Sequence, residues 1–377
     1  MKIYFDCAAT SKIFQDILLS MERVFKEYYA NPNSIYSDGQ KSRQLIEESR
    51  RNIAQYLGVE PEEIIFTSGA TESNNTIIRG LAESYPEKNE IIITPIEHKS
   101  VLNPVKFLAK KGYKVHFLKI DKNGIIDIDD LKRKISEKTL LVVIIHGNNE
   151  TGVLQDVETV SKICRENDVF FFSDVVQTIC KEKFDTEIFD FISVSGHKIN
   201  APKGIGFFYK RKDIKLTPLL FGGGQEFGLR SGTENIAFIK FLSDAIHEWD
   251  TDNDDKVKHL RFLRDLWEIN LKEAIPDIHI VSEQAKRVPH ISCIIFPQVD
   301  AQSMILGLSS RDMAVSSGSA CSSGTPTPSH VLTAYGYSDK EALSTLRFSF
   351  CLDNTEEQIY EGIKRVKEVF ESLKEFY

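Results

Sequence analysis

Short apolar runs alternate with amphipathic stretches between residues 63 and 209, and this alternation limits the possible folds more than any other feature of the chain. The runs are rich in β-branched and aromatic residues and lie at 64–66, 91–93, 115–117, 141–145, 169–172 and 191–194. Strands that are apolar throughout and separated by helices are typical of a mostly parallel sheet covered by helices on both faces. We therefore predict an α/β fold. Ligands of such sheets bind beyond the carboxyl ends of the strands, so the residues after each run are candidates for a functional site.

The pattern changes after a charged segment at residues 250–258. Beyond this segment it predicts a helix, short strands near 278–281 and 291–296, and a terminal helix from Thr355. A chain of 377 residues exceeds the usual size of one domain. We predict a large domain over residues 12–255 and a smaller α+β domain over residues 256–377, joined by the N-terminal segment 1–11.

The charge of the chain argues against two classes of partner. The formal net charge is -8 and no dense run of Lys and Arg occurs, so we expect no direct binding of nucleic acid or of an anionic membrane. The longest aliphatic run, residues 140–145, is too short to span a bilayer, and the first residues meet the charge of Asp6 before any apolar signal core forms. We predict a cytoplasmic protein.

The six cysteines are scattered along the chain without a C-x-x-C pair. This pattern predicts reduced thiols, most of them small core residues, rather than a disulfide framework or a metal site. Cys321 differs from the others because its neighbours are mainly Gly, Ser and Ala, which offer little to pack in a core. We expect Cys321 to lie on an accessible loop.

Two residues that follow predicted strands have side chains suited to cofactor chemistry. Lys198 closes the sequence Ser195-Gly196-His197-Lys198 after the run at 191–194. Most lysines are solvated surface charges, but a lysine at a strand's carboxyl end can form a Schiff base, and desolvation there would free its amine. Asp174, with Gln177 three residues later, follows the run at 169–172. Its carboxylate suits either a helix N-cap or the partner of a pyridinium nitrogen.

Three further segments have both a structural and a functional interpretation. The turn at residues 67–71 leads from a strand into a helix, so its N–H groups and the Thr71 hydroxyl suit either capping or a phosphate. His98 follows the run at 91–93 and suits either a structural role or stacking on a planar cofactor. Asn148 and Asn149 follow the run at 141–145, where their amides suit either a turn or a ring hydroxyl.

Taken together, these segments resemble the cysteine desulfurases of the class V aminotransferase family, which are pyridoxal-phosphate enzymes of fold type I. The matching segments lie at 4–10, 31–34, 66–75, 97–102, 148–152, 174–177, 195–198, 222–235, 318–324, 329–332 and 346–349. Each motif is weak by itself. Their order and spacing over almost the whole chain favour the functional interpretation of each.

The resemblance implies a pyridoxal 5'-phosphate cofactor, no metal, and a defined set of site residues. Lys198 would be the Schiff-base lysine, Asp174 the partner of the pyridine nitrogen, and His98 a stacking residue that also moves protons. Asn149 and Gln177 would hold the ring oxygen. The phosphate ligands would come from the turn at Gly69, Ala70 and Thr71, from Ser195 and His197, and from Thr233 of the second subunit of a homodimer. Arg347 would clamp the substrate carboxylate, assisted by Asn31 and Asn149.

The implied activity is the transfer of sulfur from L-cysteine to Cys321 as a persulfide, with release of L-alanine. A sulfur-acceptor protein of iron–sulfur cluster assembly or tRNA thiolation would then receive the sulfur. The alternatives are a selenocysteine lyase or another class V aminotransferase, and a non-catalytic sulfur-transfer partner. Transamination needs no thiol at Cys321, and a non-catalytic protein needs neither Lys198 nor Arg347, so an aminotransferase and a non-catalytic partner are disfavoured. A selenocysteine lyase stays open as an alternative.

Four positions depart from the usual family pattern. Cys7 stands where asparagine is common, Ala30 replaces a glycine, Tyr36 replaces a histidine, and Ser173 replaces the histidine before the aspartate. These positions lie beside the residues expected to do the chemistry. They therefore affect the expected rate and the choice of sulfur acceptor more than the type of reaction.

Overall fold

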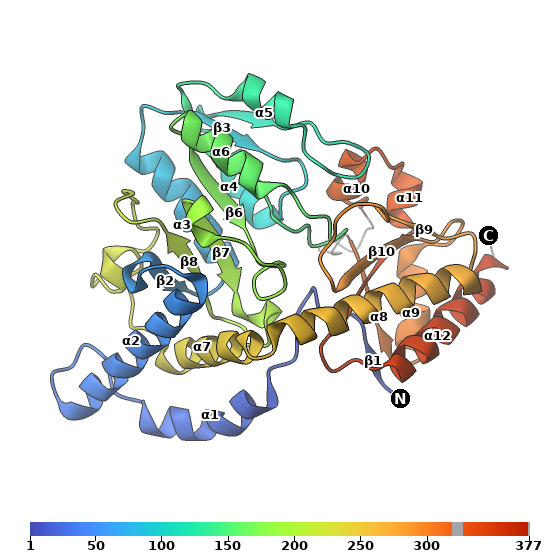
Figure 1. Cartoon of the computed structure of the whole chain (residues 1–377), viewed down its shortest axis with the longest axis horizontal. Coiled ribbons are helices and arrows are strands. Elements are labelled where there is room, and N and C mark those ends of the chain that lie inside the picture. The colour runs from blue at the N-terminus through green and yellow to red at the C-terminus, as the bar shows by residue number, and fades with distance from the viewer. Residues whose placement is uncertain (319–326, 376–377) are drawn as a thin grey trace.

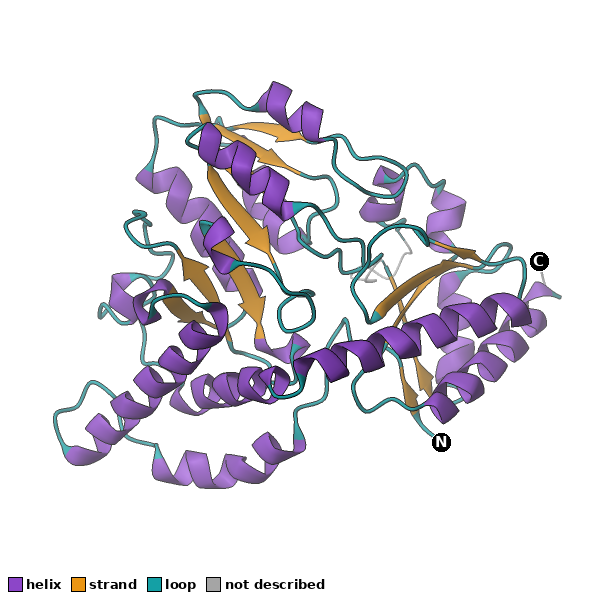
Figure 2. Ribbon diagram, in the orientation of Figure 1, coloured by secondary structure: helices purple, strands orange, loops and turns teal. Residues whose placement is uncertain are grey.

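The computed structural model describes residues 1–318 and 327–375, and its centre is a seven-stranded sheet in the order β2-β8-β7-β6-β5-β3-β4 (Figure 2). Its strands are β2 (Ile64–Thr67), β3 (Glu90–Ile93), β4 (Lys114–Phe117), β5 (Thr139–Val143), β6 (Phe170–Asp174), β7 (Phe191–Ser195) and β8 (Gly206–Lys210). The strands pair in parallel except at β8, which runs antiparallel to both of its neighbours. Each of the six predicted apolar runs is therefore confirmed as a strand of this sheet.

Helices cover both faces of the sheet, as Figure 1 shows. They are α1 (Gln15–Glu27), α2 (Ser37–Leu57), α3 (Ala70–Ser84), α4 (Lys99–Ala109), α5 (Ile128–Lys134), α6 (Val157–Glu166) and α7 (Ile236–Asp250). Successive strand residues enter different cores: Ile65 and Phe172 pack with α3 and α4, whereas Phe66 and Phe171 pack with α2, α6 and α7. Most of these strands are apolar throughout because both of their faces are buried, whereas the edge strand β4 is partly exposed.

A smaller α+β part follows the charged segment. It contains a four-stranded sheet in the order β12-β13-β10-β9. Its strands are β9 (His279–Ile280), β10 (Ile291–Ile295), β12 (Ser316–Ser317) and β13 (Thr345–Ser349), and its helices are α8 (Asn253–Ala274), α9 (Ala301–Ser309), α10 (His330–Ala334), α11 (Asp339–Leu343) and α12 (Glu356–Lys374). Helix α8 runs from the large sheet to the smaller one and lies beside α12 (Figure 1). The predicted fold class is confirmed, and the boundaries at residues 12 and 256 stay a prediction.

The N-terminal segment lies between the two parts of the molecule. Strand β1 (Ile3–Tyr4) pairs in parallel with β11 (Met313–Ala314) of the smaller part, and Asp6 bridges to Ser349 at the end of β13. Five residues later the chain reaches the large part, where the Ser11 N–H donates to the His197 carbonyl oxygen at 2.8 Å. Among residues 1–318 and 327–375, none of the helices is long and apolar enough to cross a membrane.

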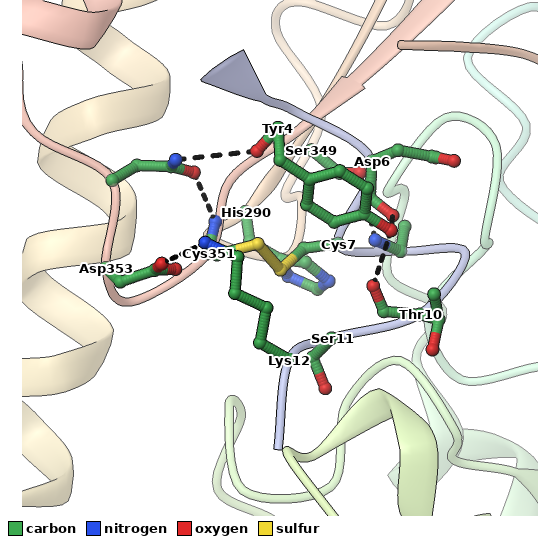
Figure 3. The surroundings of a disulfide bond; sticks show 12 residues. Tyr4, Asp6, Cys7, Thr10, Ser11, Lys12, His290, Ser349, Cys351 and Asp353 are labelled. Carbon is green, nitrogen blue, oxygen red and sulfur yellow. Dashed lines mark hydrogen bonds and ion pairs between the residues drawn. A yellow bond between two sulfur atoms is a disulfide. The ribbon is translucent and has the colours of Figure 1, made fainter. Parts of the chain in front are cut away.

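The prediction that the cysteines are reduced is wrong for two of them. Cys7 and Cys351 form a disulfide with their Cα atoms 5.4 Å apart, which lies in the ordinary range of about 4.4–6.8 Å (Figure 3). The two residues are 344 positions apart, so sequence spacing gave no sign of the pair. They meet because the bridge between Asp6 and Ser349 aligns the two segments that carry them. Cys164, Cys180 and Cys293 are free and buried, as predicted, and Cys321 lies outside the described residues.

Candidate active site

A cavity of about 780 Å³ lies at the carboxyl ends of β5, β6 and β7, and Arg347 of β13 contributes to its wall. Eleven of the predicted site residues line this cavity: Gly69, Ala70, Thr71, His98, Asn149, Asp174, Gln177, Ser195, His197, Lys198 and Arg347. Asn31 and Thr233 are exposed and are not among its described lining residues. Cys321, the predicted sulfur acceptor, lies outside the described part of the chain.

The lysine at the centre of the site ends the 3-10 helix η3 (Gly196–Lys198), which starts directly after β7. Lys198 Nζ donates to the carbonyl oxygens of Ala8 and Ala9 at 2.7 and 2.6 Å. Burial first and the positive charge of Arg347 second lower the pKa of Lys198, against the opposing effect of Asp6 and Asp174, and the result is a pKa of about 8. A useful fraction of the amine is therefore neutral near physiological pH.

A buried chain of hydrogen bonds connects the carboxylate at the end of β6 with the histidine of the opposite wall. Asp174, only 4% exposed, accepts from Asn74 Nδ2 at 3.2 Å and from the Val176 N–H at 3.1 Å. Asn74 Nδ2 also donates to Ser100 Oγ at 2.8 Å, and Ser100 Oγ lies 2.6 Å from His98 Nδ1. Burial raises the pKa of Asp174, which means that its carboxylate would be stabilised by a cation in the cavity.

The histidine itself begins helix α4. Its Nδ1 caps the helix by accepting from the Ser100 N–H at 3.2 Å. The ring is exposed to the cavity, yet the surrounding protein withdraws it from bulk water and lowers the pKa of His98. The structural interpretation is therefore confirmed for His98, which caps α4, and its ring lines the cavity, while stacking on a cofactor stays a prediction.

The turn between β2 and α3 lies close to the backbone of β8. Gly69 has a φ of 145°, and a Cβ on Gly206 of β8 would lie only 2.7 Å from the Gly69 Cα atom. Two glycines thus allow the start of α3 to pack directly against β8, beside Ser195. On the same side, burial and the nearby Lys198 and Lys203 lower the pKa of His197 to about 4, so its ring is neutral at pH 7. This corner of the cavity offers hydrogen-bond donors to an anion.

The predicted carboxylate clamp has two of its donors occupied within the chain. Arg347 Nη2 pairs with Asp6 Oδ1 at 2.8 Å, and Nη1 donates to the Asn149 carbonyl oxygen at 2.9 Å. Its Nε is buried and has no hydrogen-bond partner among the described residues. A guanidinium held in this way still has a free donor for a ligand carboxylate.

The two asparagines after β5 have different surroundings in the structure. Asn148 Oδ1 accepts from the N–H groups of Glu150 and Thr151 at 2.9 and 3.0 Å, so this side chain forms the turn. Asn149 lines the cavity instead. In the turn after β6, Gln177 Nε2 donates to the Ala8 carbonyl oxygen at 3.0 Å, while Gln177 Oε1 lies 3.2 Å from His290 Nε2.

Sequence reasoning missed several residues that hold this site together. Asp6, Asn74 and Glu150 lay inside matching segments, but no role was predicted for them. Glu150 is 4% exposed, hydrogen-bonds to Ser329 at the start of α10, and has a pKa that burial raises to about 7. A signal for Asn74 existed in its position one helical turn after the predicted phosphate site at residues 67–71. His290 gave no such signal.

These findings agree with comparisons to known proteins. The sequence profile of the aminotransferase class-V family matches residues 3–361, and the chain belongs to this family.

Three relatives illustrate the likeness. The chain is 37% identical to the cysteine desulfurase IscS of Dictyoglomus turgidum, over 99% of this chain and 95% of that protein. It is 38% identical to the putative cysteine desulfurase IscS 1 of Bacillus subtilis, over 99% of each. Among solved structures, a NifS-like protein superposes with a TM-score of 0.93 at 36% identity, covering 99% of this chain and 100% of that one.

Proposed function

We propose that this protein is a pyridoxal-phosphate-dependent cysteine desulfurase. The observation that carries the proposal is the convergence of Lys198 and Asp174, from the ends of the paired strands β6 and β7, on one cavity that also contains Arg347. An amine, a buried carboxylate and a guanidinium are the groups needed to hold an aldehyde, a pyridine nitrogen and an amino-acid carboxylate. The curated relatives are named as desulfurases, which favours this chemistry over transamination.

The residues of the cavity fit pyridoxal 5'-phosphate. Lys198 would bind its aldehyde carbon, Asp174 its ring nitrogen, and His98 one face of its ring. Gly69, Ala70, Thr71, Ser195 and His197 would hold the phosphate, while Asn149 and Gln177 would contact the ring oxygen. The raised pKa of Asp174 supports this fit, because a protonated ring nitrogen supplies the cation that the buried carboxylate lacks. When bound, the cofactor would act as an electron sink for the α-carbon of the substrate.

The protein side chains would then position the substrate and move its protons. Arg347 would bind the substrate carboxylate through Nε and through the Nη2 that now pairs with Asp6, with Asn31 and Asn149 as further contacts. Lys198 Nζ, with its lowered pKa, would remove the α-proton, and His98 would move a proton at the substrate sulfur or amine.

The sulfur step needs no outside oxidant. The Cys321 thiolate attacks the sulfur of L-cysteine, a sulfur–sulfur bond forms, and the carbon–sulfur bond breaks. The β-carbon receives a proton and leaves as L-alanine, while Cys321 keeps the sulfur as a persulfide. We further propose that a cytoplasmic acceptor protein of cluster assembly or tRNA thiolation takes this sulfur, and that the enzyme is a homodimer in which Thr233 serves the partner's phosphate site.

The decisive experiment measures α-proton exchange and alanine release on one sample of the Cys321→Ser variant. L-cysteine should still shift the visible absorbance and exchange its α-proton with deuterium, because Lys198 and the clamp are intact. Alanine release should fall to background, since a serine hydroxyl is a poor sulfur acceptor. Cys164→Ala is the matched control, because Cys164 is a free, buried cysteine on α6. Alanine release at the parental rate in Cys321→Ser would contradict the proposal, as would a purified protein that cannot bind pyridoxal phosphate.

A further inference from the structure

The disulfide lies directly behind the candidate active site. Cys7 and Cys351 line a small cavity of about 10 Å³ together with Lys198 and His290. Figure 3 shows the disulfide with His290 beside it. Both cysteines are buried, at 7% and 3% exposed. The space beside the sulfur atoms holds about one water probe.

The residues on either side of Cys7 make the contacts that orient two site residues. Asp6, which precedes it, accepts from Arg347 Nη2 at 2.8 Å. Ala8 and Ala9, which follow it, accept from Lys198 Nζ at 2.7 and 2.6 Å. A displacement of Cys7 therefore moves the acceptors of both the lysine and the arginine.

The other half of the disulfide belongs to the segment that carries the arginine. Cys351 follows β13, the strand of Arg347, and its N–H donates to Asn354 Oδ1 at 2.7 Å. On the opposite side, the N–H groups of Cys7 and Ala8 donate to the Ser349 carbonyl and hydroxyl oxygens at 3.2 and 2.9 Å. The disulfide thus fastens the segment of Asp6, Ala8 and Ala9 to a strand that is itself fixed in a sheet.

We propose that Cys7 and Cys351 are positioning residues of the active site, whose disulfide holds the residue 6–9 segment against Lys198 and Arg347 and whose reduction loosens it. This inference rests on the proposed function. A dithiol would supply two electrons and two protons, the sulfur–sulfur bond would break into two thiols, and the dithiol would become a disulfide. Disulfides of cytoplasmic proteins are usually catalytic or sense the redox state, so the predicted location favours a responsive bond over a purely structural one.

The response follows from packing. Two thiol sulfurs cannot approach as closely as two bonded sulfurs, so reduction pushes them apart, and both are buried against neighbouring side chains. Cys351 follows β13 by two residues and its N–H makes a short hydrogen bond of 2.7 Å to Asn354, whereas Cys7 lies in a turn and its N–H makes a longer one of 3.2 Å to Ser349. Cys7 is therefore the half that moves, and Asp6, Ala8 and Ala9 move with it.

The test uses the holoenzyme in two redox states and L-alanine as the ligand, because alanine has the carboxylate for Arg347 but no thiol that could reduce the disulfide. One sample is purified in air, and the other is treated with dithiothreitol and desalted without oxygen. Alkylation and peptide mass spectrometry give the state of Cys7 and Cys351. The visible absorbance gives the dissociation constant of L-alanine and the pH midpoint of the bound cofactor. Reduction should weaken alanine binding about tenfold and shift the midpoint, as expected when one good hydrogen bond is lost.

Two variants make the assignment specific. Cys7→Ser/Cys351→Ser should behave as the reduced enzyme in both conditions, and Cys164→Ala should keep the full redox response. Should the double variant fail to fold, the comparison of the two wild-type samples decides alone. If the oxidised and reduced enzymes both release alanine from L-cysteine but bind L-alanine with equal dissociation constants, this inference alone is overturned. Free thiols at Cys7 and Cys351 in the air-purified enzyme would also overturn this inference alone. Absence of alanine release in both forms would overturn the proposed function as well.

Discussion

Charged residues on both sides of the cavity determine the protonation state of the Lys198 amine. Burial and Arg347 favour the neutral form, whereas Asp6 and Asp174 favour the charged form, and the result is a pKa of about 8. Because Asp6 also pairs with Arg347, these two residues act on Lys198 in opposite directions from a single ion pair. Their substitution offers a direct check on the site's electrostatics.

The rate at which the apoprotein binds pyridoxal phosphate should rise with pH through about 8, because only the neutral amine attacks the aldehyde. Arg347→Gln removes a charge that lowers the pKa of Lys198, so it should move this midpoint to higher pH. Asp6→Asn removes a charge that raises the pKa and should move the midpoint to lower pH. The measurement is the rate of growth of visible absorbance between pH 6 and 10. Shifts in the same direction for both variants would refute the electrostatic assignment.

Lys198→Ala should lose the lysine-bound cofactor absorbance and reduce alanine release to background. Lys181 also lies nearby and has a pKa lowered to about 8 by burial, so it is the obvious substitute. However, Lys181 Nζ donates to the Lys198 carbonyl oxygen at 3.0 Å and lines the small cavity behind the site rather than the main one. Borohydride reduction followed by peptide mapping checks the assignment. A cofactor label on Lys181 in the wild-type protein would contradict it.

At the scale of elements, a buried ion pair joins α2 to the start of the sheet. Arg50 of α2 and Glu226 of η4 (Glu226–Gly228) have side chains only 1% exposed and pair through two contacts of 2.7 and 2.9 Å. Glu226 also accepts from the Phe66 N–H of β2 at 2.8 Å, and Arg50 donates to the Ile64 carbonyl oxygen at 2.6 Å. Removing one charge would leave the other buried without its partner.

Arg50→Met should therefore lower the free energy of unfolding by about 3–5 kcal/mol. Lys26→Met is the matched control, because it breaks an exposed ion pair with Glu22 within α1 and should cost about 0.5 kcal/mol or less. Urea denaturation followed by circular dichroism measures both variants. A loss below 1 kcal/mol for Arg50→Met would mean that the pair contributes no more than a surface contact.

The sequence predicted the strands of the large sheet well because most of them are buried on both faces, which leaves an unbroken apolar run such as residues 141–145. It predicted the positions of Lys198 and Asp174 because chemistry in parallel sheets lies at strand ends. It could not predict Asp6 beside Arg347 or Cys7 beside Cys351, since each pair joins positions more than 340 residues apart. Such contacts depend on how the two parts of the molecule pack, which no local pattern encodes.

At the scale of the whole molecule, two predicted site residues, Asn31 and Thr233, are exposed and are not among the described residues that line the cavity of their own chain. Thr233 is exposed, and the preceding loop carries the exposed side chains of Phe221 and Phe227. An apolar surface of this kind is typical of an interface between subunits. The proposed dimer would let Thr233 reach the phosphate site of the other subunit.

A hybrid dimer tests this arrangement. Lys198→Ala and Thr233→Val chains are expressed together with different tags and purified as the mixed dimer. If Thr233 acts on the partner, the site that lost Lys198 is also the site that receives the substituted residue 233. The other site is then intact, so the hybrid should keep one active site of its two. If Thr233 acts within its own chain, each site carries one change and the hybrid should be nearly inactive. Alanine release per dimer separates the two arrangements, and a fully active monomer in sedimentation would exclude both.

The disulfide also changes the connectivity of the polypeptide. With 344 positions between its cysteines, it closes nearly the entire chain into a macrocycle, from which two short tails emerge, one of them carrying α12. Closing so long a loop removes conformational entropy from the unfolded chain, on the order of 5 kcal/mol in the chain-entropy description. A single backbone cleavage anywhere between the two cysteines would open the circle without releasing a fragment. In its oxidised form the protein is therefore circular in topology although its gene product is linear.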